Sequence, residues 1–218
     1  MIGGAALSRI YNDHVLPRLT VLLCSDSSTA RWREQVCSGV TGDVLEVGFA
    51  NGTNLLHYPA SVSRVYAVEP SDVAWRKAAD RTREFGRPVE RVGLDGASVA
   101  LPDSSVDAVV TVYTMCTIPD LGGALTEMRR VLRPGGSLHF VEHGLSPDPP
   151  VADRQHRWTP RWGKVAGGCH LDRDIPALVE EAGFNLSDLE AFYMPGPRFS
   201  RPFGWLTIGR AEPVTASG

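Results

Sequence analysis

The stretch LEVGFANGTN, residues 45–54, decides the fold, because an apolar run leads directly into a glycine loop. Gly48 and Gly52 let the backbone adopt positive φ and approach a ligand closely. A dinucleotide-binding fingerprint would read GxGxxG, but Ala50 stands where its second glycine is expected, and the third glycine is missing. We therefore expect a ligand-binding cradle of another kind, with a plain strand-to-helix turn as the alternative.

Short apolar runs alternate with helical patterns along the chain. The runs cover residues 43–48, 64–70, 89–94, 106–113 and 136–142. Runs that are apolar at consecutive positions are typical of strands buried on both faces of a parallel sheet. The alternation therefore predicts a doubly wound sheet with right-handed crossovers.

Helical patterns fill the segments between these runs. Residues 2–40 are expected to be helical. Leucine and methionine recur at helical spacing over residues 121–132, and the proline in RPGG, residues 133–136, stops that pattern. A further helix is expected over residues 175–182, ended by Gly183.

The end of the chain departs from this alternation. Residues 186–194 and 203–211 are two strand-like runs, joined by the proline-rich segment PGPRFSRP. The joining segment is too short for a crossover helix, so the two runs should pair antiparallel as a hairpin. The predicted fold is α/β: a Rossmann-like doubly wound seven-stranded sheet, mostly parallel with a C-terminal antiparallel hairpin, and with helices on both faces.

The length of 218 residues suits one compact domain with a core that needs no disulfide or metal. Within it we expect an N-terminal helical cap (residues 1–40), the main domain (41–211) and a flexible tail (212–218). Four cysteines without a CxxC pair fit a reducing cytoplasm.

Composition also limits the partners. The net charge of -3 gives no electrostatic footprint for nucleic acid. No apolar stretch reaches the roughly 20 residues that a membrane helix needs. Peripheral membrane contact through residues 15–23 stays open, as does the oligomeric state.

Polar residues follow the second and third strand patterns. Glu69 closes the second run, roughly 20 residues beyond the glycine loop, where an acidic residue can accept hydrogen bonds from ribose hydroxyls. Pro70 fixes the turn after it, and Asp95 ends the third run, where it can meet the amino group of an adenine. Ligands of open α/β sheets bind beyond the carboxyl ends of the strands, so these residues should share one site.

Four segments together resemble the motifs of class I S-adenosylmethionine-dependent methyltransferases: LEVGFANGTN, AVEP, LDGASVALPDSSVDAVV and MRRVLRPGGSLHFVEHG. The resemblance covers about residues 40–145 and agrees with the closing hairpin. It implies S-adenosylmethionine as cofactor and S-adenosylhomocysteine as product. The cofactor-binding residues that it implies are Glu46, Gly48, Ala50, Gly52, Glu69, Asp95, Gly96 and Ala97. Asn51 in the glycine loop, Pro70 after Glu69 and Tyr113 after the fourth strand pattern are expected to bind the cofactor as well.

A narrower resemblance covers residues 106–184. VYTMCTIPD, FVEHG, RWTPRWGKVAGGCHLDRD and EEAGF look like segments of the subgroup of thiol S-methyltransferases and their relatives. This implies a small-molecule acceptor, with a thiol favoured. Transfer to oxygen, carbon or nitrogen of a quinol-like or lipid-headgroup substrate is the alternative, and a cofactor-binding regulatory domain without turnover is a third interpretation.

The residues expected to act on the methyl acceptor lie at the end of the fifth strand pattern. His143 is the expected base or orienting group, with Glu142 as its partner or as an acceptor-positioning group. The alternative is that Glu142 caps a turn and His143 lies at the rim. Substrate-contacting or lid residues are expected to be Tyr11, Cys116, Trp158, Trp162 and Cys169.

No metal site is expected. Cys116, His139, Cys169 and His170 are scattered along the chain, whereas structural zinc sites typically use close ligand pairs.

Overall fold

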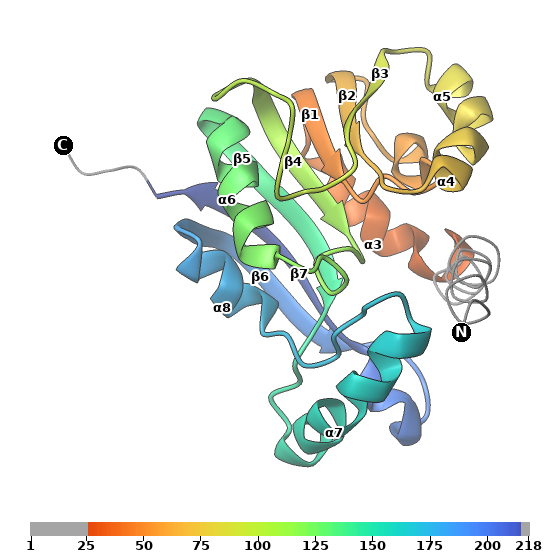
Figure 1. Ribbon diagram of the computed structural model, residues 1–218, viewed down its shortest axis with the longest axis vertical. Helices are drawn as coiled ribbons and strands as arrows, with labels where there is room; N and C mark the ends of the chain where they lie inside the picture. The colour runs from red at the N-terminus through yellow and green to blue at the C-terminus, as the bar shows by residue number, and fades with distance from the viewer. Residues whose placement is uncertain (1–25, 215–218) are drawn as a thin grey trace, which may run out of the picture.

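The computed structural model describes residues 26–214, and its centre is one sheet in the order β3-β2-β1-β4-β5-β7-β6. Figure 1 shows this sheet with its strands labelled. The strands are β1 (Gly42–Val47), β2 (Val62–Val68), β3 (Val89–Gly93), β4 (Val106–Val112), β5 (Leu132–His143), β6 (Phe184–Tyr193) and β7 (Trp205–Pro213).

The pairing of the strands matches the predicted fold class. β1 lies between β2 and β4 and is parallel to both, while β7 runs antiparallel to β5 and β6. The consecutively apolar runs become strands buried on both faces, as in β4, where Val109 and Val110 are both fully buried. The strand order reverses between β1 and β4, and this switch point puts the ligand crevice beyond their carboxyl ends.

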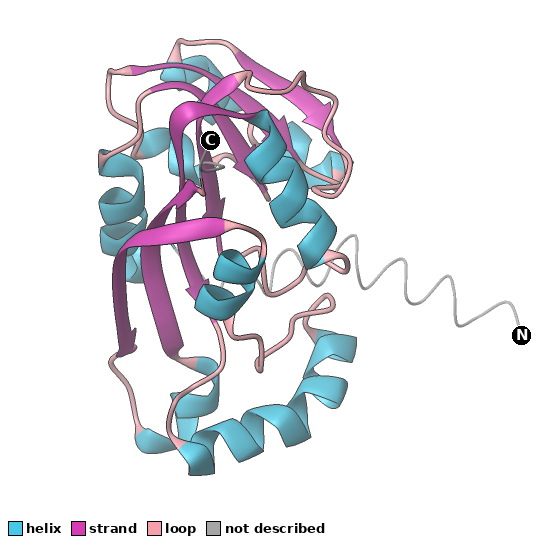
Figure 2. Cartoon of the chain, turned by 90° about the vertical axis from the view of Figure 1, so that its left-hand side faces the viewer, coloured by secondary structure: helices cyan, strands magenta, loops and turns pink. Residues whose placement is uncertain are grey.

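Helices cover both faces of the sheet, as Figures 1 and 2 show. Met128 and Val179 belong to the core under one set of helices, and Trp32 and Leu55 to the core under the other. The first set is α6 (Leu121–Val131) and α8 (Ile175–Glu181), and the second is α3 (Asp26–Ser38), η2 (Thr53–Leu56), α4 (Asp72–Lys77) and α5 (Ala79–Phe85).

One helix lies outside these two layers. Figure 1 shows α7 (Pro149–Val165) beyond the end of β5, next to η3 (Arg198–Phe203). The buried side chain of Gln155 fixes α7 there, because its amide donates to the carbonyls of Gly144 and Pro202 and accepts from the Ser146 amide. The helix is therefore tied to the loop after β5 and to η3.

The ends of several elements differ from the predictions. Leu132 pairs with Val106 of β4 and starts β5, so α6 stops one residue earlier than the helical spacing indicates. β7 extends to Pro213 because this residue pairs with Phe184, two residues into the predicted tail. Tyr11 and residues 15–23 lie outside the described residues. Within the described part, no helix has both the length and the apolar character needed to cross a bilayer.

Candidate active site

The loop after β1 has the left-handed backbone that its small residues suggest. Gly48 has φ +84, and a Cβ added there would lie 2.1 Å from Oγ1 of Thr114. Ala50 also adopts positive φ, +50, with its side chain exposed to solvent. The loop thus keeps a glycine-like shape at position 50, at a cost of about 1 kcal/mol for an alanine in that conformation.

Glu69 joins the end of β2 to this loop. Its Oε2 accepts a hydrogen bond of 2.6 Å from the Ala50 amide, and its Oε1 accepts one of 2.7 Å from the Ser71 amide. Burial raises the pKa of Glu69, although the two amides oppose that rise. The carboxylate predicted to meet the ribose therefore lies beside the cradle, with Pro70 in the turn that follows.

Glu46 supports the cradle from below. Its carboxylate is buried and accepts hydrogen bonds from Nδ2 of Asn54 at 2.9 Å and from the hydroxyl of Tyr58 at 2.7 Å. Burial raises the pKa of Glu46 to about 7, with these two hydrogen bonds opposing the rise. Both oxygens thus bind the segment that follows the cradle, which gives Glu46 a bracing role there.

The other residues that the sequence predicts to bind the cofactor lie in the cradle itself and in the turn after β3. Asn51 accepts a side-chain hydrogen bond of 2.7 Å from Thr53 within the cradle. Oδ1 of the exposed Asp95 accepts from the Ala97 amide at 3.0 Å. Gly96 is packed against Val47, since a Cβ there would lie 3.1 Å from Cγ1 of that residue. The turn after β3 therefore touches the end of β1, as a shared site requires.

The turn after β4 connects the cradle to the end of β5. It begins with Tyr113 at φ +54, followed by Thr114, whose side chain fills the space beside Gly48. The two carboxylate oxygens of Glu142 accept from the Thr114 amide at 2.8 and 2.9 Å. Burial raises the pKa of Glu142 to about 7, against the effect of the Thr114 and Met115 amides. Glu142 therefore holds the β4 turn, and its expected role as partner of His143 or as an acceptor-positioning group stays a prediction.

His143 is the last residue of β5, and its ring forms a hydrogen bond with a cysteine sulfur. Its Nε2 lies 3.1 Å from Sγ of Cys169, and Nδ1 is buried with no hydrogen-bond partner among residues 26–214. Burial opposes a proton on the ring, but the hydrogen bond and negative charge of Cys169 outweigh it and raise the pKa of His143.

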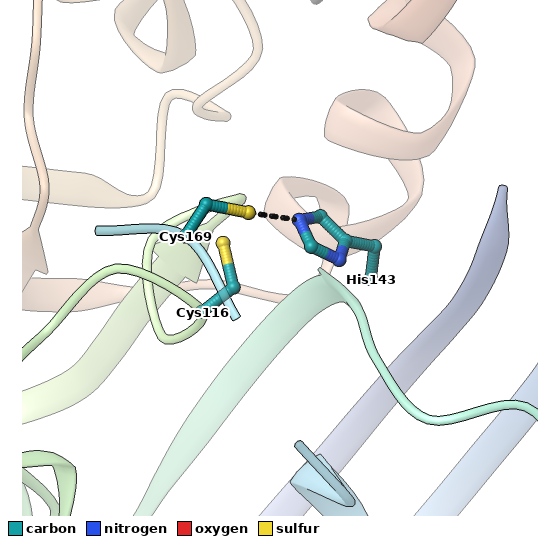
Figure 3. A group of neighbouring side chains, drawn as sticks. All are labelled: Cys116, His143 and Cys169. Carbon is teal, nitrogen blue, oxygen red and sulfur yellow. Dashed lines mark hydrogen bonds between the residues drawn. The ribbon is translucent and has the colours of Figure 1, made fainter. Parts of the chain in front are cut away.

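Cys169 lies at the centre of a small polar cluster with Cys116, His143 and Trp162. The indole Nε1 of Trp162 donates to its sulfur at 3.3 Å. Hydrogen bonding from Cys116 lowers the pKa of Cys169 most, and His143 and Trp162 add to this, so the pKa lies below its ordinary range although burial opposes the shift. In Figure 3 the two cysteine sulfurs and the imidazole point toward one another. This edge of the site thus stabilises negative charge on sulfur.

The fold gathers metal-ligating side chains that the sequence separates. Ligand atoms of Cys116, His143 and Cys169 all lie within 4.8 Å of one another. His139 lies elsewhere, beside Ser137 at 2.9 Å, and the exposed ring of His170 has its Nδ1 3.8 Å from Asp172. Spacing along the chain could not anticipate this grouping, because its three members come from β5 and two separate loops.

The two tryptophans offered as a lid pack against one residue of η3. Trp158 stacks on Phe203 with ring centroids 5.6 Å apart, and Trp162 lies 4.7 Å from the same ring. Trp158 is 37% exposed, whereas Trp162 reaches Cys169. Sequence reasoning missed Phe203, Gln155 and Thr114, since none of them belongs to a motif. Their roles come from contacts between distant segments.

Comparison with known proteins identifies the family. Residues 45–140 match a family described as a methyltransferase domain. Over 179 residues the chain is 32% identical to the thiol S-methyltransferase TMT1B of Mus musculus, covering 78% of this chain and 69% of that protein. It is 30% identical to the thiol S-methyltransferase TMT1A of Homo sapiens over 202 residues, covering 84% and 78%. The chain belongs to the class I S-adenosylmethionine-dependent methyltransferases, and S-adenosylmethionine is its cofactor.

Other relatives differ in what their names say they methylate. The phosphatidylethanolamine N-methyltransferase of Cereibacter sphaeroides is 29% identical over 149 residues, which cover 67% of this chain and 72% of that protein.

Solved structures agree on the fold. The YcgJ protein of Bacillus subtilis has a TM-score of 0.66 at 15% identity, covering 88% of this chain and 99% of the other. A SAM-dependent methyltransferase of Methanosarcina mazei has a TM-score of 0.58 at 18% identity, covering 80% and 93%.

Proposed function

We propose that the chain transfers the methyl group of S-adenosylmethionine to the sulfur of a small thiol. The observation that carries this proposal is the cluster of Cys116, His143, Trp162 and Cys169, in which the His143 imidazole and the Trp162 indole both lie within hydrogen-bond distance of the Cys169 sulfur. Two relatives named thiol S-methyltransferases support the same acceptor class.

The residues on the cofactor side fit S-adenosylmethionine. The loop from Gly48 to Gly52 has the open left-handed backbone that close approach to a ligand needs, and Glu69 lies against it. Asp95 is exposed, so its second oxygen is available to an adenine amino group. When bound, the cofactor supplies a methyl group activated by the sulfonium charge. Glu69 would hold the ribose, and Asp95, Gly96 and Ala97 would flank the adenine.

The acceptor side has to align the thiol and remove its proton. A thiol has an ordinary pKa of about 8.5, so much of it is protonated at neutral pH. We assign to His143 the promotion of proton loss from the acceptor sulfur. Glu142 positions the β4 turn through the Thr114 amide, and thereby sets the distance between cradle and acceptor. Trp158 and Trp162 cover this side and exclude water, which protects an attacking thiolate from solvation.

The direct test is a panel of small thiols incubated with the protein and S-adenosylmethionine, analysed by mass spectrometry. We expect a methyl thioether and S-adenosylhomocysteine in equal amounts. His143→Ala should lower turnover by about 10²-fold or more and change cofactor affinity little. His170→Ala is the matched control, because its exposed ring lies one residue from Cys169 and is not assigned a role in the reaction.

The second candidate is transfer to a lipid-headgroup amine, which the relative named phosphatidylethanolamine N-methyltransferase favours. A quinol-like ring is a further alternative acceptor. Methylation of such a substrate, with every thiol unmodified, would contradict the thiol proposal. Binding of S-adenosylmethionine without product from any acceptor would instead support a regulatory domain.

A further inference from the structure

Cys116, His143, Trp162 and Cys169 are named the sulfur cluster. Three of these side chains form a ligand set that the methyl transfer itself does not require. Cys116 follows β4, His143 ends β5, and Cys169 lies in the loop after α7. Their ligand atoms all lie within 4.8 Å of one another, and Figure 3 shows two sulfurs and one imidazole converging. In a tetrahedral zinc site with bonds of about 2.0–2.3 Å, neighbouring ligand atoms are about 3.5–3.8 Å apart. The 3.1 Å between Nε2 of His143 and Sγ of Cys169 and the 4.8 Å limit for the whole group lie on either side of that spacing.

We infer that Cys116, His143 and Cys169 bind one Zn²⁺ ion and leave its fourth coordination position for the sulfur of the acceptor. Two thiolates and one imidazole form a soft set that suits zinc better than magnesium or calcium. Three protein ligands with one open position are the pattern of catalytic zinc sites rather than structural ones.

The segments that carry the ligands are fixed by other contacts. The His170 amide donates to the Cys116 carbonyl at 2.8 Å, which ties the loop after α7 to the loop after β4. The guanidinium of Arg173 donates to the Met115 carbonyl beside it. At the end of β5, the Gly144 amide donates to the Trp205 carbonyl at 3.2 Å. The ligands are therefore held near their binding positions by the fold.

The surroundings of the cluster suit a divalent ion. The indole of Trp162 donates to the sulfur of Cys169, and such outer donors orient metal ligands and tune their charge. Cys116 and Cys169 are 2% and 7% exposed. Two thiolates neutralise one Zn²⁺, so the site with zinc bound carries no net charge, and its buried charges are compensated by coordination.

The role of the ion rests on the proposed thiol transfer. The acceptor thiol would bind the open position as a thiolate, and its proton would leave to solvent. A bond forms between this sulfur and the methyl carbon as the bond from that carbon to the sulfonium sulfur breaks. The electron pair of the broken bond stays on the departing sulfur. In this arrangement His143 promotes loss of the acceptor thiol's proton indirectly, as a ligand of the ion.

Metal binding is measured first, without any substitution. The reduced protein is freed of metal by a chelator and titrated with Co²⁺, which replaces zinc and reports its ligands by absorption. We expect one equivalent to bind with a thiolate-to-cobalt charge-transfer band that Zn²⁺ abolishes. Addition of an acceptor thiol should change that spectrum. Absence of a charge-transfer band in folded protein would overturn the site.

Variants then locate the site. Cys116→Ala and Cys169→Ala should each weaken Zn²⁺ binding by at least 100-fold. The matched control is Cys37→Ala, because Cys37 is also buried but lies in α3 and is not one of the three proposed ligands. Thermal unfolding identifies any variant that fails to fold, and the cobalt spectrum of the unsubstituted protein does not depend on the variants. Equal zinc affinity in all four proteins would mean adventitious binding and would overturn the site.

Activity separates the two proposals. Thiol methylation that falls at least 100-fold without zinc and returns with it supports both. Thiol methylation at full rate in metal-free protein would overturn the role of zinc and leave the thiol acceptor standing. Zinc binding that depends on both cysteines, with every thiol unmodified, would support the metal site and overturn the thiol acceptor.

Discussion

The cradle after β1 and the sulfur cluster both lie at the carboxyl ends of the parallel strands, but they are built in opposite ways. The cradle is contiguous: Gly48, Ala50 and Gly52 all lie in the loop after β1, and Glu46, which binds the segment after that loop, belongs to β1 itself. The cluster is assembled from Cys116, His143 and Cys169, which are far apart in sequence. One region depends on backbone conformation, the other on side chains brought together by the fold.

This difference teaches where each kind of information lies. Backbone shape in the cradle is set by which residues accept positive φ, a local property. The chemistry of the cluster depends on distances between segments, which are a property of the whole sheet. Thr114 links the two, because its side chain packs beside Gly48 and its amide binds Glu142.

The largest effect is expected from Gly48→Ala. The added Cβ would meet the side chain of Thr114 at φ +84, and Thr114 has little room to move while Glu142 holds its amide. We expect a loss of unfolding free energy of roughly 2–4 kcal/mol, and loss of cofactor binding, measured by denaturant unfolding and calorimetry. Gly122→Ala, in α6 with 3.9 Å to its nearest contact, is the control and should be neutral or stabilising. Equal stability of the two variants would contradict this account of the cradle.

A comparable effect, visible in pH dependence, is expected from Glu46→Gln. The pKa of Glu46 is about 7 in the folded chain and 4.5 ordinarily, so the folded state keeps a proton that the unfolded state loses. The free energy of unfolding therefore falls by on the order of 3 kcal/mol as pH rises from about 4.5 to 7.

The glutamine variant carries no such proton, so its stability relative to the parent should increase between pH 5 and pH 8. Glu142 also has a raised pKa, but it is present in both proteins and its contribution cancels. A difference in unfolding free energy that stays constant with pH would show that Glu46 is ionised throughout.

An intermediate effect is expected from Glu69→Ala. Removal of the carboxylate takes away the proposed ribose contact and the acceptor of the Ala50 amide. Affinity for S-adenosylmethionine should fall by about 1–3 kcal/mol, roughly 5- to 150-fold, in a calorimetric titration. Cys169→Ala should leave that affinity within about twofold, if the two regions act separately. Equal losses from both variants would break the division between cradle and cluster.

The smallest effect is expected from Ala50→Gly. Glycine relieves a strain of about 1 kcal/mol at φ +50, but it adds about 0.5–1 kcal/mol of backbone entropy to the unfolded chain. Stability should change by less than about 0.5 kcal/mol, and cofactor affinity by less than about twofold. A large gain in affinity would mean that the alanine methyl group obstructs the cofactor.

Much of the fold could be predicted from the sequence. The five parallel strands follow from runs that are apolar at consecutive positions, and the hairpin follows from the short proline-rich joint between its strands. Element ends were less predictable. Leu132 fits a helical spacing, yet it pairs with Val106, because contacts across the sheet outweigh local preference.

The sequence by itself determined the α/β architecture, the position of the cradle and the acidic residue at the end of β2, because periodicity and glycine placement are local signals. Only the tertiary structure decided that Glu142 holds the β4 turn and that Cys116, His143 and Cys169 meet. The physical reason is that hydrogen bonds and metal ligation act over about 2–3.5 Å between atoms, and only the closed sheet sets such distances between remote segments.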